Sequence, residues 1–352
     1  MKAIIVSLKF NPGHFSHLIA NYKLFESLNY KSYLFVNPSF DKMDVDDSYD
    51  KIYDLNSFNK GDLKVAVFWF PSLNNILAII KLRFFLKAKV IYVYHEPFDS
   101  IKSYSKSGFG ILKIIKICLI NLVSIVIVFF SNDIILPSIT SLGLYKKKYK
   151  KVNNNYTMIP LLFDDEGNDF IKKENKKYIS YIGTVAADHA FDKFVDFAVK
   201  AMTYDWFPGC QFLIATSSII PQIEKDKIKQ FVSNGKIFVQ EGGAMSNCEI
   251  NNFFETSVLV WNAYNRSMQS GVLPKAFMFG TPVIILKKNE NEFMQNKITG
   301  LLIDDNNDVF EIKVAVEYIL SRKDFFFVNC RAKFKETFYY KNKINVFKEL
   351  IE

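Results

Sequence analysis

Short, almost wholly apolar segments alternate with helix-like segments along this chain, and the alternation occurs twice. In the first half, the segments that read as buried strands are KAIIVSL, KSYLFVN, KVAVFWFPS, AKVIYVYHE and NDIILPS. In the second half, they are KYISYIGTV, CQFLIATS, GKIFVQEG, SVLVWNAY and TPVIIL. A strand that is apolar along its whole length must be covered on both faces, and the helices between parallel strands supply that cover. The pattern therefore predicts an α/β protein with two doubly wound, Rossmann-like domains.

A polar stretch without periodicity separates the two series and predicts the domain boundary. We expect a first domain over residues 1–163, a linker over 164–177 and a second domain over 178–330. The length of 352 residues fits two domains of about 150 residues each. Residues 331–352 are predicted to form a C-terminal helix that can cross back to the first domain. Two facing domains would leave a central cleft at the carboxyl ends of the strands, where open parallel sheets bind ligands.

The excess of positive charge is confined to the first half of the chain. Residues 1–163 carry 21 Lys and Arg against 11 Asp and Glu, whereas the rest carries 24 against 25, which accounts for the net charge of +9. The basic residues are interleaved with Phe, Ile and Leu, a mixture that suits contact with an anionic membrane. A merely solvated basic face is an equal alternative, and no recognition motif points to a nucleic-acid partner. The basic clusters are Lys81, Arg83, Lys87 and Lys89, then Lys102, Lys106, Lys113 and Lys116, then the YKKKYKK run that ends at Lys151.

No segment is expected to span a membrane or to direct export. The uncharged run from Ile117 to Ser131 is shorter than the ~20 residues of a spanning helix, so we predict a buried helix that leads into a buried strand. The N-terminus lacks the long apolar core and the cleavage site of a signal peptide. The cysteines lie far apart, without metal-ligand spacing, and read as reduced thiols of a cytosolic protein. They are Cys118, Cys210, Cys248 and Cys330.

The stretch NRSMQSGVLPKAFMFGTPVIIL, from Asn265 to Leu286, places a Ser-Gly turn, a short helical run and a Gly-Thr-Pro turn directly before an apolar strand. With the later NKITGLLIDDNND, it resembles the bacterial family 4 glycosyltransferases (glycosyl transferases group 1) of surface-polysaccharide synthesis. Weaker resemblances at YISYIGTV, YTMIPLLFD, SNDIILPS and YHEPFD extend over most of the chain. The resemblance implies the GT-B architecture, with two Rossmann-like domains, and a nucleotide-sugar donor.

The turn at Ser270 and Gly271 is the predicted contact to the donor diphosphate. A diphosphate gains negative charge as the sugar leaves, and amide N–H groups at the start of a helix can stabilise that charge without a metal. The amides concerned belong to Gly271, Val272 and Leu273, and glycine allows the backbone to approach closely. The alternative is an ordinary connection from a strand through a helix to the next strand.

Four positions depart from the family pattern. Where the family has two glutamates eight positions apart, near the donor sugar and the ribose, this chain has Ser267 and Lys275. Where the family often has an arginine and a lysine that reach the phosphates, it has Thr184 and His189. Arg266 and Lys275 are cations that could replace the missing phosphate charge. For Lys275, a side chain that points to solvent is an equal alternative.

Further candidate residues follow predicted strands, at the carboxyl edges of the sheets. The resemblance implies that His95 contacts the donor sugar, and Glu96 could act as the base that takes the acceptor proton. Because the family is retaining, the leaving phosphate could take that proton instead. No Asp-x-Asp stands at a strand end, so we expect no metal ion and no cofactor. The remaining donor-binding candidates are Gly13 and His14 in the first strand-to-helix turn, Gly183 and Thr184 after the first strand of the second domain, and Gly243 in the expected base-binding loop.

The function expected from the resemblance is a retaining, metal-independent glycosyltransferase. It would move a sugar from a nucleotide-diphosphate donor to a lipid-linked or polysaccharide acceptor, in bacterial capsule, O-antigen or related glycan synthesis. The basic, apolar first domain leads us to expect a cytoplasmic protein that is peripheral on the inner face of the cell membrane. Two alternatives stay open: a non-catalytic GT-B-like partner subunit, favoured by the replaced glutamates, and a sugar-nucleotide epimerase. A homodimer or a complex with a partner transferase is possible under each.

Overall fold

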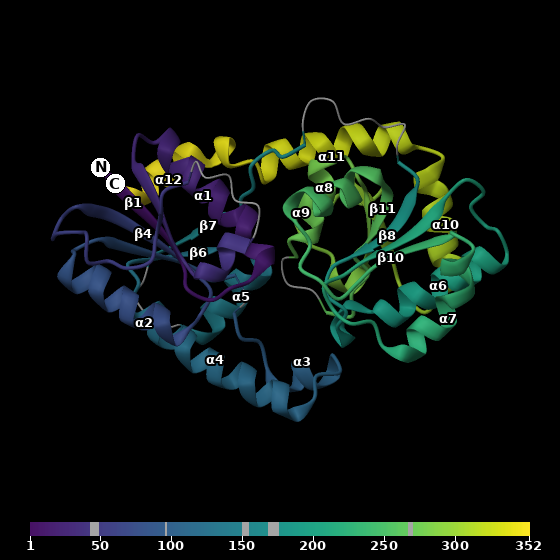
Figure 1. Cartoon of the computed structure of the whole chain (residues 1–352), viewed down its shortest axis with the longest axis horizontal. Helices are drawn as coiled ribbons and strands as arrows, with labels where there is room; N and C mark the ends of the chain where they lie inside the picture. The colour runs from purple at the N-terminus through teal and green to yellow at the C-terminus, as the bar shows by residue number, and fades with distance from the viewer. Residues whose placement is uncertain (43–48, 96, 150–154, 168–175, 267–269) are drawn as a thin grey trace. The chain divides into compact units, whose positions relative to one another are not determined.

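The computed structural model describes residues 1–42, 49–95, 97–149, 155–167, 176–266 and 270–352. The chain divides into two compact units, which are shown in Figure 1. The first unit comprises Met1–Asp164 together with Phe338–Glu352, and the second comprises Asp165–Thr337. Each unit is described by itself below.

The first unit is built on a parallel sheet of seven strands in the order β3-β2-β1-β4-β5-β6-β7. The central strands are buried on both faces, as their apolar sequences require. The order reverses between β1 and β4, and such a reversal is where open parallel sheets bind ligands. The strands are β1 (Lys2–Ser7), β2 (Lys31–Val36), β3 (Lys51–Ile52), β4 (Leu63–Trp69), β5 (Lys89–Val93), β6 (Asp133–Leu136) and β7 (Asn155–Met158).

Helices connect these strands, and serine side chains begin several of them. Ser72 accepts a hydrogen bond from the backbone of Asn75 at the start of α2, and Ser138 forms a capping box with Ser141 at the start of α5. The α-helices are α1 (Phe15–Ser27), α2 (Leu73–Ile80), α3 (Ile101–Lys106), α4 (Ile111–Phe130), α5 (Ile139–Lys148) and α12 (Ile344–Ile351). The shorter helical turns are η1 (Pro12–His14), η2 (Pro38–Lys42), η3 (Lys81–Phe85), which continues α2, and η7 (Tyr340–Lys343).

Helix α4 corrects one expectation from the sequence. The apolar run does form a helix that leads into the buried strand β6, but the helix itself is largely exposed. Only Ile114, Ser124, Ile127 and Val128 are buried along its length. The helix is apolar nearly all round, and a helix on the outside of a sheet can press only one stripe against the core.

The second unit contains a parallel sheet of six strands in the order β10-β9-β8-β11-β12-β13, with the reversal between β8 and β11. The expected α/β class, with two doubly wound parallel sheets, is therefore confirmed. The strands are β8 (Tyr178–Ile182), β9 (Gln211–Ala215), β10 (Ile237–Gln240), β11 (Ser257–Trp261), β12 (Val283–Leu286) and β13 (Gly300–Ile303). The helices are η5 (Ala187–His189), α6 (Phe191–Thr203), α7 (Gln222–Ser233), α8 (Asn247–Thr256), α9 (Val272–Met278), η6 (Lys287–Asn289), α10 (Val309–Leu320) and α11 (Lys323–Thr337).

The C-terminal segment is not one helix, because α11 ends at Thr337 and α12 begins at Ile344. Between them, the backbone of Phe338 and Tyr340 pairs with Phe163 through hydrogen bonds of 2.9 and 3.1 Å. Beyond this bridge, α12 lies against α1 (Figure 1), where the rings of Phe347 and Phe25 meet edge to face. The end of the chain thus completes the core of the first unit.

Candidate functional site

Three of the four histidines of the chain gather at the carboxyl edge of the first sheet. His14 ends the turn after β1, His17 lies on α1, and His95 follows β5. The ring centroid of His14 lies 6.4 Å from that of His17 and 6.0 Å from that of His95. Because β1, β4 and β5 are neighbours in the sheet, their carboxyl ends bring these residues together at the point where the strand order reverses.

His14 is buried, and its imidazole is held in the neutral form. Burial lowers the pKa of His14 well below 6.5, and the nearby His95, His17 and Lys9 lower it further. One ring nitrogen, Nε2, lies 3.2 Å from the side-chain amide of Asn11, while Nδ1 has no hydrogen-bond partner among the described residues. Because the amide nitrogen of Asn11 donates to Nε2, the proton is on Nδ1, which can donate a hydrogen bond to a ligand hydroxyl or phosphate oxygen.

His17 was not singled out from the sequence, although it supports His14 from the next turn of helix. Its Nδ1 lies 2.9 Å from the carbonyl oxygen of Leu162, so the proton is on Nδ1 and donates to that carbonyl. Its ring stacks on Trp69, with the planes 2° apart. The signal in the sequence was the repeat of histidine three positions after His14, which places both residues on one side of a helix start.

The turn after β4 completes this cluster in the first unit and was also missed. Phe70 has a positive φ of 66°, an unusual conformation for a bulky residue, and its ring lies 4.5 Å from that of His14. The side-chain amide of Asn75 donates to the carbonyls of Trp69 and Phe70 and fixes the turn. Gly13 lies beside His14, with its amide 3.1 Å from Asn11 Oδ1. The predicted base Glu96 lies outside the described residues.

In the second unit, Gly183, Tyr264 and Val272 meet at the corresponding reversal point, between β8 and β11. Gly183 has a φ of +144°, and a Cβ there would lie 3.7 Å from the hydroxyl of Tyr264 and 3.8 Å from Val272. Both distances are ordinary van der Waals contacts, so it is the positive φ that requires glycine at this position. Tyr264 was not singled out from the sequence; it lies just beyond the end of β11 and is buried.

The loop after β8 is tied to Tyr264 through His189. The carbonyl oxygen of Thr184 accepts hydrogen bonds from Tyr181 Oη at 2.7 Å and His189 Nδ1 at 2.8 Å. The His189 ring stacks on Tyr264, with ring centroids 4.4 Å apart. Thr184 and His189, which replace the arginine and lysine of the resembled family, thus lie together beside Gly183.

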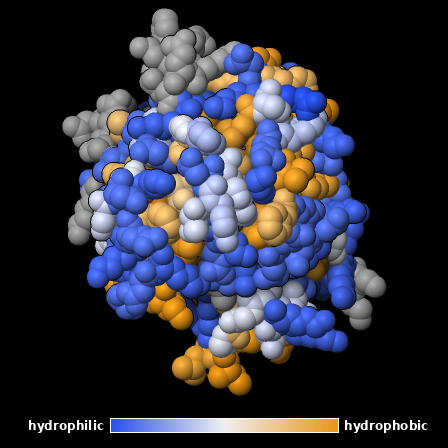
Figure 2. Space-filling model, turned by 90° about the vertical axis from the view of Figure 1, so that its right-hand side faces the viewer, coloured by the Kyte–Doolittle hydropathy of each residue, from blue (hydrophilic) through white to orange (hydrophobic). Residues whose placement is uncertain are grey.

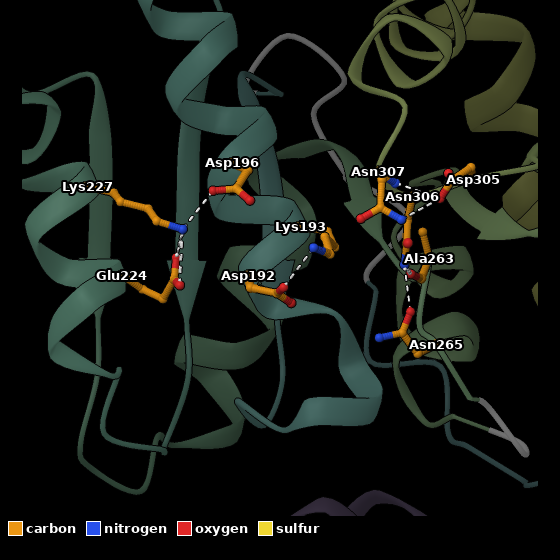
Figure 3. A network of polar contacts seen from close by, with 10 residues as sticks. All are labelled: Asp192, Lys193, Asp196, Glu224, Lys227, Ala263, Asn265, Asp305, Asn306 and Asn307. Carbon is orange, nitrogen blue, oxygen red and sulfur yellow. Dashed lines mark hydrogen bonds and ion pairs between the residues drawn. The ribbon is translucent and has the colours of Figure 1, made fainter. Parts of the chain in front are cut away.

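The loop after β13 is tied to the segment after β11, as Figure 3 shows. The side-chain amide of Asn306 donates to the carbonyl of Ala263 at 2.9 Å and to Asn265 Oδ1 at 3.1 Å. The backbone amide of Arg266 donates to the carbonyl of Asp188, at 3.2 Å. These bonds hold the chain in place on either side of Tyr264. In the same view, Lys227 on α7 donates hydrogen bonds to Asp196 on α6 and to Glu224 on its own helix. The bond to Asp196 joins α6 to α7.

In the predicted phosphate turn, Ser270 and the residues after it belong to the described part of the chain, whereas Ser267 lies outside it. Gly271 immediately precedes α9 with a φ of −65°, and the amide of Val272 donates to Ser270 Oγ at 3.1 Å. The hydroxyl of Ser270 therefore occupies one of the three amides expected to face a diphosphate. Leu273 is buried.

Lys275 does not point to solvent, and this alternative was wrong. Its side chain is buried, and Nζ lies 2.7 Å from Glu166 Oε2, 2.7 Å from Asn251 Oδ1 and 3.2 Å from Asn247 Oδ1. Three acceptors match the three hydrogens of an ammonium group, so this geometry does not support Lys275 as the cation of a donor site. Burial alone would raise the pKa of the Glu166 carboxyl, but the neighbouring charge of Lys275 outweighs burial and lowers this pKa.

Gly243 lies in the exposed loop after β10, the edge strand of the second sheet. It therefore follows a strand two positions away from β8, rather than at the reversal point. Within the described ranges, no three His, Cys, Asp or Glu side chains lie close enough together to hold a metal ion. Metal independence stays a prediction.

The two parallel sheets, each with a reversal of strand order, place this chain among the α/β proteins with two doubly wound domains. Comparison with solved structures identifies the arrangement as the GT-B fold. Sucrose-phosphate synthase from Thermosynechococcus elongatus matches with a TM-score of 0.68 at 12% identity, over 99% of this chain and 98% of that one. Anabaena HepE in complex with UDP-glucose matches with a TM-score of 0.69 at 11% identity, over 100% and 99%.

A glycosyltransferase from Rickettsia africae matches with a TM-score of 0.68 at 13% identity, over 99% of this chain and 97% of that one. No protein-family model matches the chain, and no curated protein matches it by sequence. At these identities the likeness establishes the fold, and the activity has to be argued from the site.

Proposed function

We propose that this protein is a glycosyltransferase that takes its sugar from a nucleotide-diphosphate donor. The observation that carries the proposal is Gly183, a glycine with a φ of +144° that is flanked by Tyr264 and Val272 at the reversal point of the second sheet. Such a position admits the close approach of a phosphate or ribose to main-chain groups. The likeness to HepE, solved with UDP-glucose, supports this class of donor.

The proposed reaction is retaining and needs no metal. The bond from the anomeric carbon to the leaving phosphate breaks as the bond to the acceptor oxygen forms on the same face, and the acceptor proton passes to the leaving phosphate. Amides of Gly271 and Leu273, together with Arg266, would stabilise the growing charge on the diphosphate. Thr184 and His189 would line the phosphate path, and Ser267 and Gly243 stay proposals for donor binding. The contacts of Lys275 with Glu166 and two asparagines do not support that role for Lys275.

In the first unit, His14 and His95 are the groups proposed to meet the reacting sugar and acceptor. The neutral His14 can hydrogen-bond a sugar or acceptor hydroxyl without carrying a positive charge. Glu96 stays a proposal as an alternative base. The acceptor is proposed to be a lipid-linked or polysaccharide glycan of a bacterial surface polymer, at the cytoplasmic face of the membrane, because the basic first unit suits anionic lipid.

The test is a thermal-shift screen of the full chain against UDP, GDP, dTDP, CMP and their sugar conjugates, without and with magnesium. A ligand that binds the native state raises the melting temperature. We expect a metal-independent shift with one nucleoside diphosphate and its sugar, and loss of that shift in Gly183→Val. The variant Gly235→Val carries the same change at a glycine of positive φ outside the site and should keep the ligand-induced shift. A shift that needs magnesium would contradict metal independence.

A second candidate is a non-catalytic GT-B-like subunit that supports a partner enzyme. The observation in its favour is Lys275, which stands where the resembled family has a glutamate and is engaged with Glu166 rather than free for a ligand. A protein of this kind would show no shift with any nucleotide and would co-purify with a transferase.

A further inference from the structure

Helix α4 presents a continuous apolar stripe to solvent. Its members recur every three or four residues and so lie along one side of the helix. They remain exposed in the folded first unit, between 36% at Val126 and 81% at Leu112. The stripe consists of Leu112, Ile115, Leu119, Leu122, Val126 and Phe129, and we call it the α4 stripe.

The neighbouring helix extends this surface. Helix α2 packs beside α4, and its continuation η3 brings Phe84 to within 5.9 Å of Phe130, measured between ring centroids. Each helix joins two adjacent parallel strands, so right-handed crossovers place both on the same face of the sheet (Figure 1). Leu73 and Leu77 on α2 and Phe85 on η3 are exposed as well, so the helices beside α4 also carry apolar side chains on this face of the sheet.

The second unit offers a contrast. The side of the molecule that carries α6, α7 and α10 is mostly hydrophilic in Figure 2, with apolar side chains in separate patches. Scattered apolar residues of that kind are normal on a folded protein, whereas a long contiguous apolar surface marks an interaction site.

The charges around the α4 stripe indicate what covers it. From Leu63 to His95 and from Ser100 to Asn132, the sequence has no Asp or Glu but nine Lys and Arg. Lys113 and Lys116 lie exposed on α4 itself, and Lys102 and Lys106 on the adjacent α3. Apolar side chains with lysines beside them match the interface of an anionic bilayer, with acyl chains under the stripe and headgroups beside the lysines. A second copy docked through the same face would instead bring like charges together.

The packing of α4 also indicates how the helix would lie relative to a bilayer. Its 20 residues give a length of about 30 Å, and by length and composition it passes as a spanning helix. Its inner side, however, contributes Ile127 and Val128 to the core under the sheet. A helix that crossed the bilayer would have to leave that core, whereas a helix that lies flat keeps both its inner contacts and its apolar outer side.

We propose that the α4 stripe, extended by α2 and η3, docks the first unit on an anionic lipid bilayer, with α4 lying parallel to the membrane plane at the level of the headgroups. This surface deepens the proposed function by giving the enzyme direct access to a lipid-linked acceptor. Its test uses lipid binding alone, so that the lipid surface and the transferase activity can fail independently.

The experiment is flotation of the full chain with vesicles of phosphatidylcholine alone and of phosphatidylcholine mixed with phosphatidylglycerol. We expect binding to the mixed vesicles, weaker binding to phosphatidylcholine, and partial loss at high salt. The variant Leu112→Gln/Leu119→Gln/Phe129→Gln should bind the mixed vesicles at least about tenfold more weakly, because three apolar side chains no longer enter the interface. Lys113→Gln/Lys116→Gln should reduce both the affinity and its salt dependence.

The matched control is Ile219→Gln/Ile223→Gln/Val314→Gln, which changes exposed apolar residues of the second unit and should bind vesicles like the parent protein. Melting temperatures close to that of the parent verify that the variants fold, since every substituted residue is exposed. Vesicle binding that is unaffected by the α4 variant overturns the proposal. A dimer that is seen in sedimentation equilibrium for the parent protein but not for the α4 variant also overturns it, because the stripe would then be a dimer interface. Protein that stays with the membrane after alkaline carbonate extraction overturns it as well, because that result indicates a spanning helix.

Discussion

Lys275 and Glu166 form a buried ion pair, with Nζ and Oε2 2.7 Å apart, although the two residues are 109 positions apart in the chain. Asn247 and Asn251 on α8 donate to the same carboxylate oxygen and accept from the ammonium group. The four side chains join the segment after β7 to α8 and α9. In a buried polar cluster of this kind, the loss of one side chain leaves the hydrogen bonds of the other members unsatisfied.

Removal of one charge should therefore destabilise the second unit strongly. We expect Lys275→Met to lower the free energy of unfolding by about 3 to 5 kcal/mol, because the Glu166 carboxylate stays buried without its cation. The double variant Glu166→Gln/Lys275→Met should be more stable than Lys275→Met alone. Urea unfolding measures both. The control Lys287→Met breaks an exposed pair with Asp304 and should change stability by no more than about 1 kcal/mol; equal losses at the two sites would show that the buried pair has no special role.

Gly271→Val should abolish donor binding while the protein stays folded. The φ of −65° at Gly271 is open to any L-residue, so the backbone is not strained, but a branched side chain would block the approach of a diphosphate. Isothermal titration with the nucleotide found in the thermal-shift screen measures the loss, and far-UV circular dichroism verifies the fold. A dissociation constant like that of the parent protein would remove the phosphate role from this turn.

Gly280→Ala should be among the most damaging single methyl additions in the second unit. Gly280 has a φ of +65°, and a Cβ there would lie 2.4 Å from the ring of Phe327. Left-handed backbone and overlap with a packed ring together should lower stability by about 2 to 5 kcal/mol. Gly235→Ala is the control, with a φ of +73° and no atom within 4 Å of the added methyl, and should lose only about 1 to 2 kcal/mol. Urea denaturation compares the two variants, and equal losses would mean that the Phe327 ring moves aside freely.

The stability of the protein should fall in mildly acidic solution because of His14. Above the ordinary value of 6.5, the imidazole is neutral in both the folded and the unfolded chain and adds no pH dependence. Between 6.5 and the lower folded-state pKa, the unfolded chain binds a proton that the folded chain does not, so stability decreases as the pH falls. From about pH 7 to about pH 5, the melting temperature of the parent protein should drop further than that of His14→Asn. Parallel curves for the two proteins would contradict the buried neutral state.

Much of the fold could be read from the sequence, because strand burial and helix periodicity are local patterns. The apolar segments found in the sequence all became strands, and the Gly-Thr-Pro turn at Gly280 separates α9 from β12 as expected. The exposure of α4 could not be read in this way. Periodicity shows that a helix is apolar, but it does not show which of its sides another element will cover.

The candidate site was predictable only where a strand end supplied the signal. His14, His95 and Gly183 were found because they follow apolar strands. His17, Tyr264 and Asn306 were missed, since their roles come from the residues they contact in the fold: a stacked Trp69, a stacked His189 and the carbonyl of Ala263. Glu166 was missed for the same reason, as nothing near it in the chain indicates a buried partner.

By itself, the sequence determined that this chain forms two doubly wound parallel sheets, because the alternation of fully apolar strands with helices leaves no other way to cover both faces of each strand. The tertiary structure alone decided that the ring of His14 lies close to those of His17 and His95, that Lys275 turns inward to Glu166 and that the α4 stripe faces solvent. Contacts of this kind depend on the order of strands within a sheet and on which surfaces of distant elements pack together. A single stretch of sequence does not encode either of these.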